Sequence, residues 1–296
     1  MLEKLIPAQT AKQAETLDRW LEKREREQVF PEGVRLTADV PYRNDGAACH
    51  KMDIYQPKEG PRPHPVLINL HGGGFLLGRK EVNRLFCADL CLRGFLVFCP
   101  EYPLAPGQTL FTVFRDVSAA IDRICEIAPS YGGDTNRLYL CGDSAGAQLC
   151  VYLAAMQNVP ELARAAGVTP PRTRIRALGL QSGMFYTDRF DKIGLFLPNS
   201  IYGKGWRKHP FRPYINPEHP ALLRGLPPCF LVTAKGDFLR HYSQKFAAAL
   251  RQSGNPLQFL DLEADHDLPH AFTAMIPETL EAQTANTAMA AFFLSQ

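Results

Sequence analysis

The sequence predicts an α/β protein whose mostly parallel sheet is covered by helices on both faces. Two observations support this prediction. Short apolar runs alternate with segments of helical periodicity from Pro65 onward, and many of these apolar runs are continuous. Continuous apolar runs are typical of strands buried on both faces, and parallel neighbours need helical connections between them. With 296 residues, the chain can form one large domain or two small ones around a sizeable core.

The individual elements follow from the same patterns. Within residues 11–28, Ala14, Leu17 and Leu21 recur at helical spacing between charged residues, which predicts an amphipathic helix. Strands are expected at 34–40, 51–55, 66–70, 95–99, 137–141, 175–180, 229–233 and 257–262. Further helices are expected at 80–92, 111–127, 145–156, 240–251 and 277–294.

Residues 185–220 interrupt the alternation of strands and helices. This segment is irregular, contains five prolines and is rich in aromatic residues. Its position after a core strand favours a cap over a functional site, and a surface excursion anchored by its aromatic side chains is the alternative. We therefore expect an N-terminal cap segment at 1–45, a first part of the core at 46–184, a cap insertion at 185–220 and a second part of the core at 221–296.

The composition argues against several classes of protein. Lys and Arg total 33 and Asp and Glu total 30, and a net charge of +3 is too small for the basic surface of a nucleic-acid-binding protein. No stretch approaches the roughly 18 apolar residues of a membrane-spanning helix, and the first residues lack the apolar core of a secretory signal. The eight cysteines include no CxxC and no zinc-like spacing, so we expect buried free thiols and a cytoplasmic location. The expected partner is a small molecule.

The segment Gly142-Asp143-Ser144-Ala145-Gly146 joins a predicted strand to a predicted helix. A G-x-S-x-G sequence in this context is typical of a nucleophile elbow, in which a strained serine presents its hydroxyl above the edge of the sheet. Side chains at the two glycine positions would collide with the neighbouring strand and helix. Ser144 is therefore the predicted nucleophile.

A second glycine-rich segment, His71-Gly72-Gly73-Gly74-Phe75, follows the strand expected at 66–70. Consecutive glycines let backbone N–H groups approach a ligand, and together with the Ala145 N–H at a helix start they can bind a developing oxyanion. A flexible turn and a phosphate-binding loop are the alternatives. A Walker A loop is excluded because no GK[ST] follows.

A serine nucleophile needs a base, and the base needs an orienting carboxylate. Enzymes with this elbow carry them in the order Ser, acid, His along the chain. Asp237 follows the strand expected at 229–233, and His266 and His270 both follow the strand expected at 257–262. Two histidines four residues apart could also bind a metal, but Pro269 disfavours a helix spanning them and HExxH is absent. No metal or other cofactor is expected.

Several motifs together resemble those of the hormone-sensitive-lipase-like esterases. They are HGGG at 71–74, YPLAP at 102–106, YGGD at 131–134, GDSAG at 142–146, Asp237 and HAF at 270–272. The resemblance covers residues 65–272 and implies an α/β-hydrolase fold with a helical cap that is partly N-terminal. It also implies hydrolysis of short- to medium-chain acyl esters through an acyl-enzyme, with acetyl esters as one option, and it is compatible with a homodimer.

The same resemblance implies roles for individual residues. It selects His270 over His266, because the family's histidine precedes a small residue and Phe. A triad of Ser144, His270 and Asp237 results. The resemblance also assigns the oxyanion N–H groups to Gly73, Gly74 and Ala145.

The substrate is less well determined by the sequence. The candidate substrate-binding residues are Phe75, Asp143, Phe185 and Trp206, although each aromatic residue could equally serve in packing. Four departures from the family pattern bear on local packing and cap docking more than on the triad: Pro103, Ala147, Phe238 and His241. A small-ligand receptor on the same fold and an amidase or peptidase with the same triad are the alternatives. The presence of all three triad residues speaks against the receptor.

Overall fold

The computed structural model describes residues 2–296, with side chains described from residue 11 on. Its strands form one eight-stranded sheet in the order β1-β2-β4-β3-β5-β6-β7-β8. β1 pairs with β2, and β2 with β4, in antiparallel fashion, and the other neighbours are parallel, which confirms the predicted mostly parallel sheet. The strands are β1 (Val34–Pro41), β2 (Lys51–Pro57), β3 (His64–Leu70), β4 (Leu96–Pro100), β5 (Gly133–Asp143), β6 (Ile175–Gln181), β7 (Cys229–Ala234) and β8 (Leu257–Leu262).

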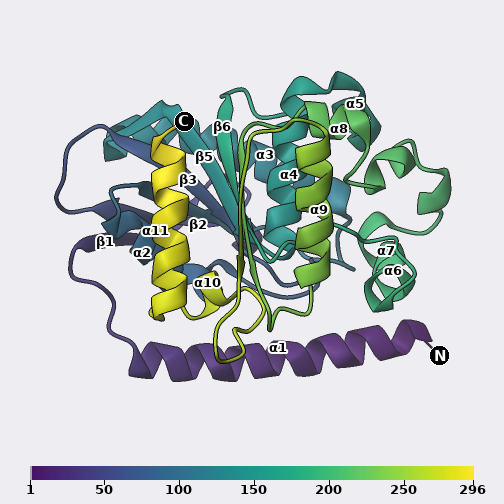
Figure 1. Ribbon diagram of the computed structural model, residues 1–296, viewed down its shortest axis with the longest axis horizontal. Helices are drawn as coiled ribbons and strands as arrows, with labels where there is room; N and C mark the ends of the chain where they lie inside the picture. Colours follow the sequence, from purple (N-terminus) through teal and green to yellow (C-terminus); the bar gives the residue numbers. More distant parts are fainter. Residues whose placement is uncertain (1) are drawn as a thin grey trace.

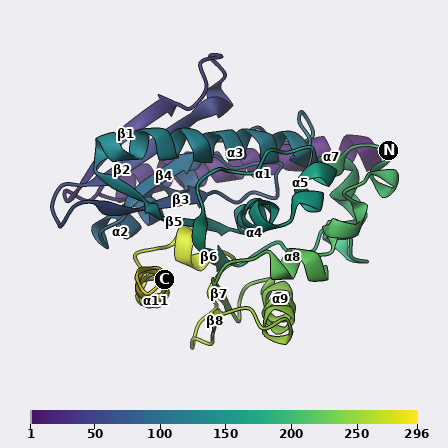
Figure 2. The ribbon, with the colours of Figure 1, turned by 90° about the horizontal axis from the view of Figure 1, so that it is seen from above.

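Helices cover both faces of the sheet, as predicted (Figure 1 and Figure 2). The hydrophobic core on one face contains side chains of α3 (Leu110–Ile127), α4 (Ala145–Asn158) and α9 (Arg240–Gln252). The core on the other face contains side chains of α2 (Arg84–Leu92) and α11 (Leu280–Leu294). The shorter helices are α5 (Pro160–Ala166), α8 (Pro220–Arg224), α10 (Phe272–Met275), and the 3-10 turns η1 (Ala48–His50) and η3 (Ala128–Tyr131).

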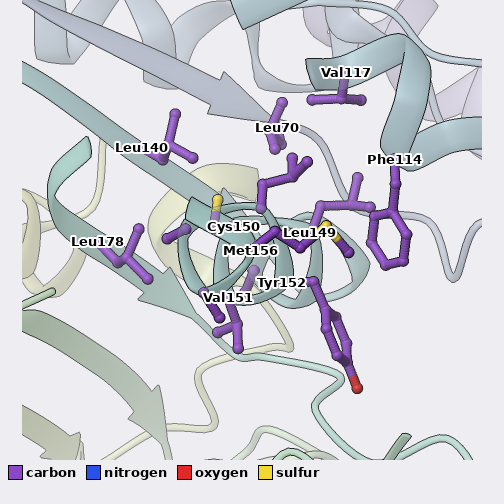
Figure 3. Close-up of a cluster of buried hydrophobic side chains, with 14 of the residues drawn as sticks. Leu70, Phe114, Val117, Leu140, Leu149, Cys150, Val151, Tyr152, Met156 and Leu178 are labelled. Atoms are coloured by element: carbon purple, nitrogen blue, oxygen red, sulfur yellow. The ribbon is translucent and has the colours of Figure 1, made fainter. Parts of the chain in front are cut away.

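Helix α4 is buried along almost its whole length. Figure 3 labels side chains of α4 from Leu149 to Met156, which lie among strand residues such as Leu140 and Leu178 and the α3 residues Phe114 and Val117. A helix that is apolar on all sides is typical of the interior of a layered domain. Because α4 starts immediately after Ser144, this packing fixes the position of the turn that carries the serine.

Most predicted elements agree with the observed ones to within a few residues, and two differ in a way that matters. The helix expected at 80–92 is a 3-10 turn, η2 (Lys80–Asn83), followed by α2. The amide of Asn83 donates a hydrogen bond to Asp143 where the two elements meet. The helix expected at 11–28 is α1 (Leu2–Glu27), which begins nine residues earlier than predicted.

Helix α1 lies along one end of the molecule (Figure 1). It contributes to the same cavity as the residues that directly follow β3 and β5, so it crosses the carboxyl end of the parallel strands. Residues 185–220 form α6 (Lys192–Phe196), α7 (Pro198–Tyr202), η4 (Trp206–Lys208) and η5 (Arg212–Ile215). Part of α6 lines this cavity as well.

The eight cysteines are free thiols, and six of them are buried, in line with the sequence-based expectation. Among the residues described, no helix has both the length and the apolar character needed to cross a lipid bilayer.

Candidate active site

The turn at Ser144 has the strained geometry of a nucleophile elbow. Ser144 lies between the end of β5 and the start of α4 with φ 53° and ψ −113°, a backbone conformation that residues other than glycine rarely adopt. A Cβ at position 146 would lie 1.9 Å from the Leu70 carbonyl oxygen, and one at 142 would lie 2.6 Å from the backbone of Gly146. The two glycines are therefore required by the close approach of the backbone segments.

The backbone of Ser144 is held by the neighbouring strand. Its N–H donates to the Gln181 carbonyl at 2.8 Å, and its carbonyl accepts from the Met184 N–H at 3.0 Å. The Ser144 residue is only 7% exposed, and the exposed part faces a large cavity. The serine is thus fixed in place and accessible only from that cavity.

Asp237 and His270 meet at the same edge of the sheet. The His270 Nδ1 atom lies 2.6 Å from the Asp237 Oδ1 atom. The carboxylate also accepts the Leu239 N–H and the Thr233 hydroxyl, both at 2.8 Å. Burial by itself would raise the pKa of Asp237, but the hydrogen bond and charge of His270 and the Leu239 N–H bring it below its ordinary value. The carboxylate is therefore stable in its charged form beside the imidazole.

The two candidate histidines occupy different places. His270 lines the same cavity as Ser144, with its ring 4.3 Å from that of Phe238. His266 has a side chain that is 62% exposed and its Nε2 lies 3.8 Å from a carboxylate oxygen of Glu281. Among the described residues, no hydrogen bond joins the Ser144 hydroxyl to His270. Such bonds are often long without substrate and shorten when it binds.

Asp143 lies on the cavity wall, and its carboxylate is hydrogen-bonded to the glycine-rich loop. Its Oδ1 atom accepts the Gly72 N–H at 3.0 Å and the Asn83 side-chain amide at 2.7 Å. A Cβ at position 72 would lie 2.2 Å from the other carboxylate oxygen, so only glycine allows this contact. Burial raises the pKa of Asp143, although the hydrogen bond from Asn83 acts in the opposite direction. Asp143 thus connects the serine turn to the glycine loop.

The rest of the glycine loop follows a strained path. Gly73 has φ 113° and Gly74 has φ 63°, values that favour glycine. The Gly73 carbonyl accepts N–H groups from Leu76 and Leu77, both at 3.1 Å. Gly73 and Gly74 line the cavity together with Ser144, and Ala145 opens the helix behind the serine. The predicted oxyanion residues are therefore brought next to the predicted nucleophile.

A buried ion pair lies behind this loop. His71 Nε2 is 2.8 Å from Glu101 Oε1, His71 Nδ1 is 2.8 Å from the Gly72 carbonyl oxygen, and the ring stacks on Tyr102 at 4.1 Å. Burial would lower the pKa of His71, but the charge of Glu101 and its hydrogen bond raise it to about 9. This pair was not predicted from the sequence. A signal was present, because His71 and Glu101 each follow one of two neighbouring parallel strands.

The cavity in front of Ser144 has a volume of about 1240 Å³. Its walls are mostly apolar and come mainly from α1, the glycine loop with η2, α6, the segment after β6, and the loops that carry Ser144, Asp237 and His270. The apolar side chains are Leu17, Trp20, Leu76, Leu77, Val82, Met184, Ile193, Phe196, Leu197, Phe238, Leu239 and Met275. Among the described residues, no group of three or more His, Cys, Asp or Glu side chains could hold a metal ion.

Three of the four predicted substrate-binding residues lie elsewhere. Phe75, Phe185 and Trp206 are buried in the hydrophobic core and do not line this cavity. Phe185 packs on Phe246 with ring centroids 4.3 Å apart, and the Trp206 indole donates to Asn199 at 3.1 Å. Asp143 lies on the wall, but its Oδ1 is directed to the loop. These three aromatic residues pack in the core, whereas α1, α6 and the loops at the carboxyl end of the sheet form the cavity walls.

Residues 67–274 match a family described as alpha/beta hydrolase fold, which is more than half of the chain. The chain belongs to the alpha/beta hydrolase fold family. This match covers almost the same residues as the resemblance to the hormone-sensitive-lipase-like esterases and confirms it. The observed sheet and helix layers agree with this family's fold.

Individual similar proteins include curated relatives and solved structures. The chain is 29% identical over 223 residues to the probable isoprenylcysteine alpha-carbonyl methylesterase of Oryza sativa subsp. japonica, covering 71% of this chain and 53% of the relative. It is 28% identical over 253 residues to carboxylesterase NlhH of Mycobacterium tuberculosis, covering 80% and 76%. Esterase B from Lactobacillus rhamnosis superposes with a TM-score of 0.90 at 22% identity, covering 99% and 95%. The chain thus spans about half the length of the plant relative.

Proposed function

We propose that this alpha/beta hydrolase is a serine carboxylic ester hydrolase that uses Ser144, His270 and Asp237 as its catalytic triad. The observation that carries the proposal is the Asp237–His270 pair at 2.6 Å on the wall of the cavity that also contains the strained Ser144. A triad is recognised by such geometry and by the role of each group. The names of the curated relatives, which include esterases, support the same reaction class.

The reaction begins with attack by the Ser144 hydroxyl on the ester carbonyl. His270 takes the hydroxyl proton, while Asp237 holds the imidazole by its Nδ1–H and stabilises the imidazolium. The negative charge on the former carbonyl oxygen is bound by the N–H groups of Gly73, Gly74 and Ala145. His270 then gives its proton to the leaving alcohol, which leaves an acyl-serine.

Water releases the acid by the reverse sequence of steps. His270 takes a proton from water, the resulting hydroxide attacks the acyl-serine, and Ser144 regains its proton as the acid leaves. Every group needed for these steps belongs to the chain, and the steps use no cofactor. The substrates we propose are short- to medium-chain acyl esters.

We also propose that α1 and residues 185–220 together form the cap over this site. Both contribute walls to the catalytic cavity, α1 through residues such as Leu17 and Trp20 and the insertion through α6. A cavity of about 1240 Å³ exceeds the roughly 300–1000 Å³ of many small-molecule sites. A cavity of this size has room for both the acyl and the alcohol part of an ester.

The test is hydrolysis of p-nitrophenyl esters from acetyl to decanoyl, combined with labelling by a p-nitrophenyl phosphonate and mass spectrometry. A burst of nitrophenol and a phosphonate adduct on Ser144 are expected. Ser144→Ala should lower kcat by about 10⁶-fold and abolish the adduct while the melting temperature stays close to that of the wild type. An intact hydrolysis rate in a clean Ser144→Ala preparation would refute the assignment.

Two further arms of the experiment separate the alternatives. Ester binding without burst or adduct would identify a ligand receptor, and anilide turnover comparable with that of matched esters would identify an amidase. An isoprenylcysteine methyl ester belongs in the substrate panel because of the name of the plant relative.

A further inference from the structure

A second cavity of about 330 Å³ adjoins the catalytic cavity. The two cavities have two wall residues in common, Trp20 of α1 and Val82 of η2. Both side chains are half-buried, so each has one part in contact with the protein and another part facing open space. Trp20 and Val82 therefore stand between the two cavities, and we refer to them together as the partition.

The partition is held in place from both sides. The Arg24 guanidinium lies over the Trp20 ring, 5.0 Å from its centroid, and two of its nitrogen atoms bond the carboxylate oxygens of Glu278 at 3.0 and 2.8 Å. Val82 belongs to η2, whose last residue, Asn83, is bonded to Asp143 at 2.7 Å. One half of the partition is thus anchored to the core through Arg24, and the other half is anchored next to the glycine loop.

The second cavity suits an uncharged, apolar group. Its apolar walls include Leu21, Phe30, Leu36 and Leu85. The charged residues in its wall are already paired, Arg24 with Glu278, Arg84 with Glu25 at 3.0 Å, and Glu81 with Lys80. An anionic or cationic ligand would have to break one of these pairs, whereas a hydrocarbon chain only has to replace water along the apolar side chains.

We propose that Trp20 and Val82 end the chain-binding part of the catalytic cavity, and that the second cavity is a subsite for the far end of longer hydrocarbon chains that opens when Trp20 is truncated. This inference rests on the proposed ester hydrolysis and identifies the residues that limit the length of the substrate's hydrocarbon chain. In the wild type the partition stops a chain that extends from Ser144 toward α1. Removing the indole ring joins the two cavities.

The experiment compares kcat/KM of Trp20→Ala and wild type for p-nitrophenyl butyrate, octanoate and dodecanoate. Each additional buried methylene contributes about fourfold, so two or three methylenes in the second cavity should raise the dodecanoate-to-butyrate ratio more than tenfold. Trp20→Phe, which keeps an aromatic ring between the cavities, should raise the ratio less. Leu294→Ala is the control, because Leu294 is 56% exposed, lies outside both proposed cap segments and lines neither cavity. Its ratio should equal that of the wild type.

A ratio within twofold of the wild type in a folded, active Trp20→Ala protein would overturn the inference. If that variant fails to fold, Val82→Ala opens the other half of the partition, and the same ratio of kcat/KM values is compared with that of the wild type.

A binding measurement that needs no turnover tests the partition separately from the proposed ester hydrolysis. In Ser144→Ala/Trp206→Phe, Trp20 is the single tryptophan, and its fluorescence should change with dodecanoate at concentrations at which butyrate has no effect. An equal response to both acids would contradict the partition even if the protein hydrolysed no ester.

Discussion

The serine edge of the sheet and helix α1 border the same cavity but are held by different kinds of contact. At the serine edge, backbone atoms meet backbone atoms, as where a Cβ on Gly146 would lie 1.9 Å from the Leu70 carbonyl oxygen. Helix α1 is attached by side chains, with Leu21 buried and ion pairs from Arg24, Asp18 and Glu25 to the core. The backbone contacts at the serine edge leave no room for a shift in position. The side-chain contacts of α1 can be altered by substituting one residue at a time.

This difference separates chemistry from selectivity. The groups that we propose to carry out the reaction need positions fixed to within a fraction of an ångström. The wall that limits the substrate needs only the right shape, and exposed ion pairs contribute about 0.2–1 kcal/mol each. We therefore expect substitutions at the serine edge to affect rate strongly, and substitutions on α1 to affect selectivity with little loss of rate or stability.

The largest expected effect comes from the histidine. His270→Ala should lower kcat by about 10⁶-fold, because Ser144 then has no base to take its proton. His266→Ala is the matched control four residues away and should keep kcat within about twofold, because its side chain is exposed and points to Glu281. Steady-state kinetics on p-nitrophenyl butyrate measure both. A larger loss at position 266 than at 270 would reverse the assignment of the base.

The contact between Asp143 and the glycine loop should have the next largest effect. Asp143→Ala leaves the Gly72 N–H and the Asn83 amide unpaired, and we expect kcat to fall about 10²-fold with KM nearly unchanged, a loss like that of one oxyanion donor. Asp143→Asn keeps an oxygen that can accept both bonds and should retain most of the activity. Equal losses in the two variants would show that the charge of Asp143 matters, instead of its position.

The buried His71–Glu101 pair should appear as a dependence of stability on pH. The pKa of His71 is raised to about 9, above its ordinary 6.5, so its stabilisation is complete below pH 6.5 and is lost as the pH rises through about 9. The loss should be about 3 kcal/mol. Denaturant unfolding at pH 6.5, 8 and 9.5 measures it, and Glu101→Gln should be less stable at pH 6.5 and nearly free of this dependence. If the free energy of unfolding changed equally with pH in the wild type and in Glu101→Gln, His71 would be ruled out as the source of the pH dependence.

The smallest effect concerns the attachment of α1. Glu278→Gln removes the ion pair to Arg24, which is partly exposed, so the free energy of unfolding should fall by less than about 1 kcal/mol. Hydrolysis of p-nitrophenyl butyrate should be unchanged. Calorimetry measures the change in stability, and the rate of p-nitrophenyl butyrate hydrolysis measures the activity. A loss of several kcal/mol would mean that α1 is part of the rigid frame and would remove the contrast between the two regions.

Much of the fold and of the candidate site could be predicted from local sequence patterns. Continuous apolar runs predicted the parallel strands, because a strand buried on both faces lacks the alternation of polar and apolar residues seen in a half-exposed strand. The two glycines around Ser144 identified the elbow, because only glycine permits the backbone contacts of that turn. Asp237 and the two candidate histidines were predicted from their positions after strands, since the carboxyl ends of parallel strands share one edge.

The tertiary structure decided the matters that depend on contacts between distant segments. The family resemblance favoured His270 over His266, whereas their positions after a strand did not separate them, and the packing of the loop that carries both brings His270 to Asp237. Aromatic residues of the insertion have the same composition whether they line a cavity or fill a core, and packing placed Phe185 and Trp206 in the core. The sequence determined which residues could form strands, turns and reactive groups, because these depend on neighbours along the chain. The placement of α1, and with it the wall at Trp20, depended on how separate elements pack, which no local pattern encodes.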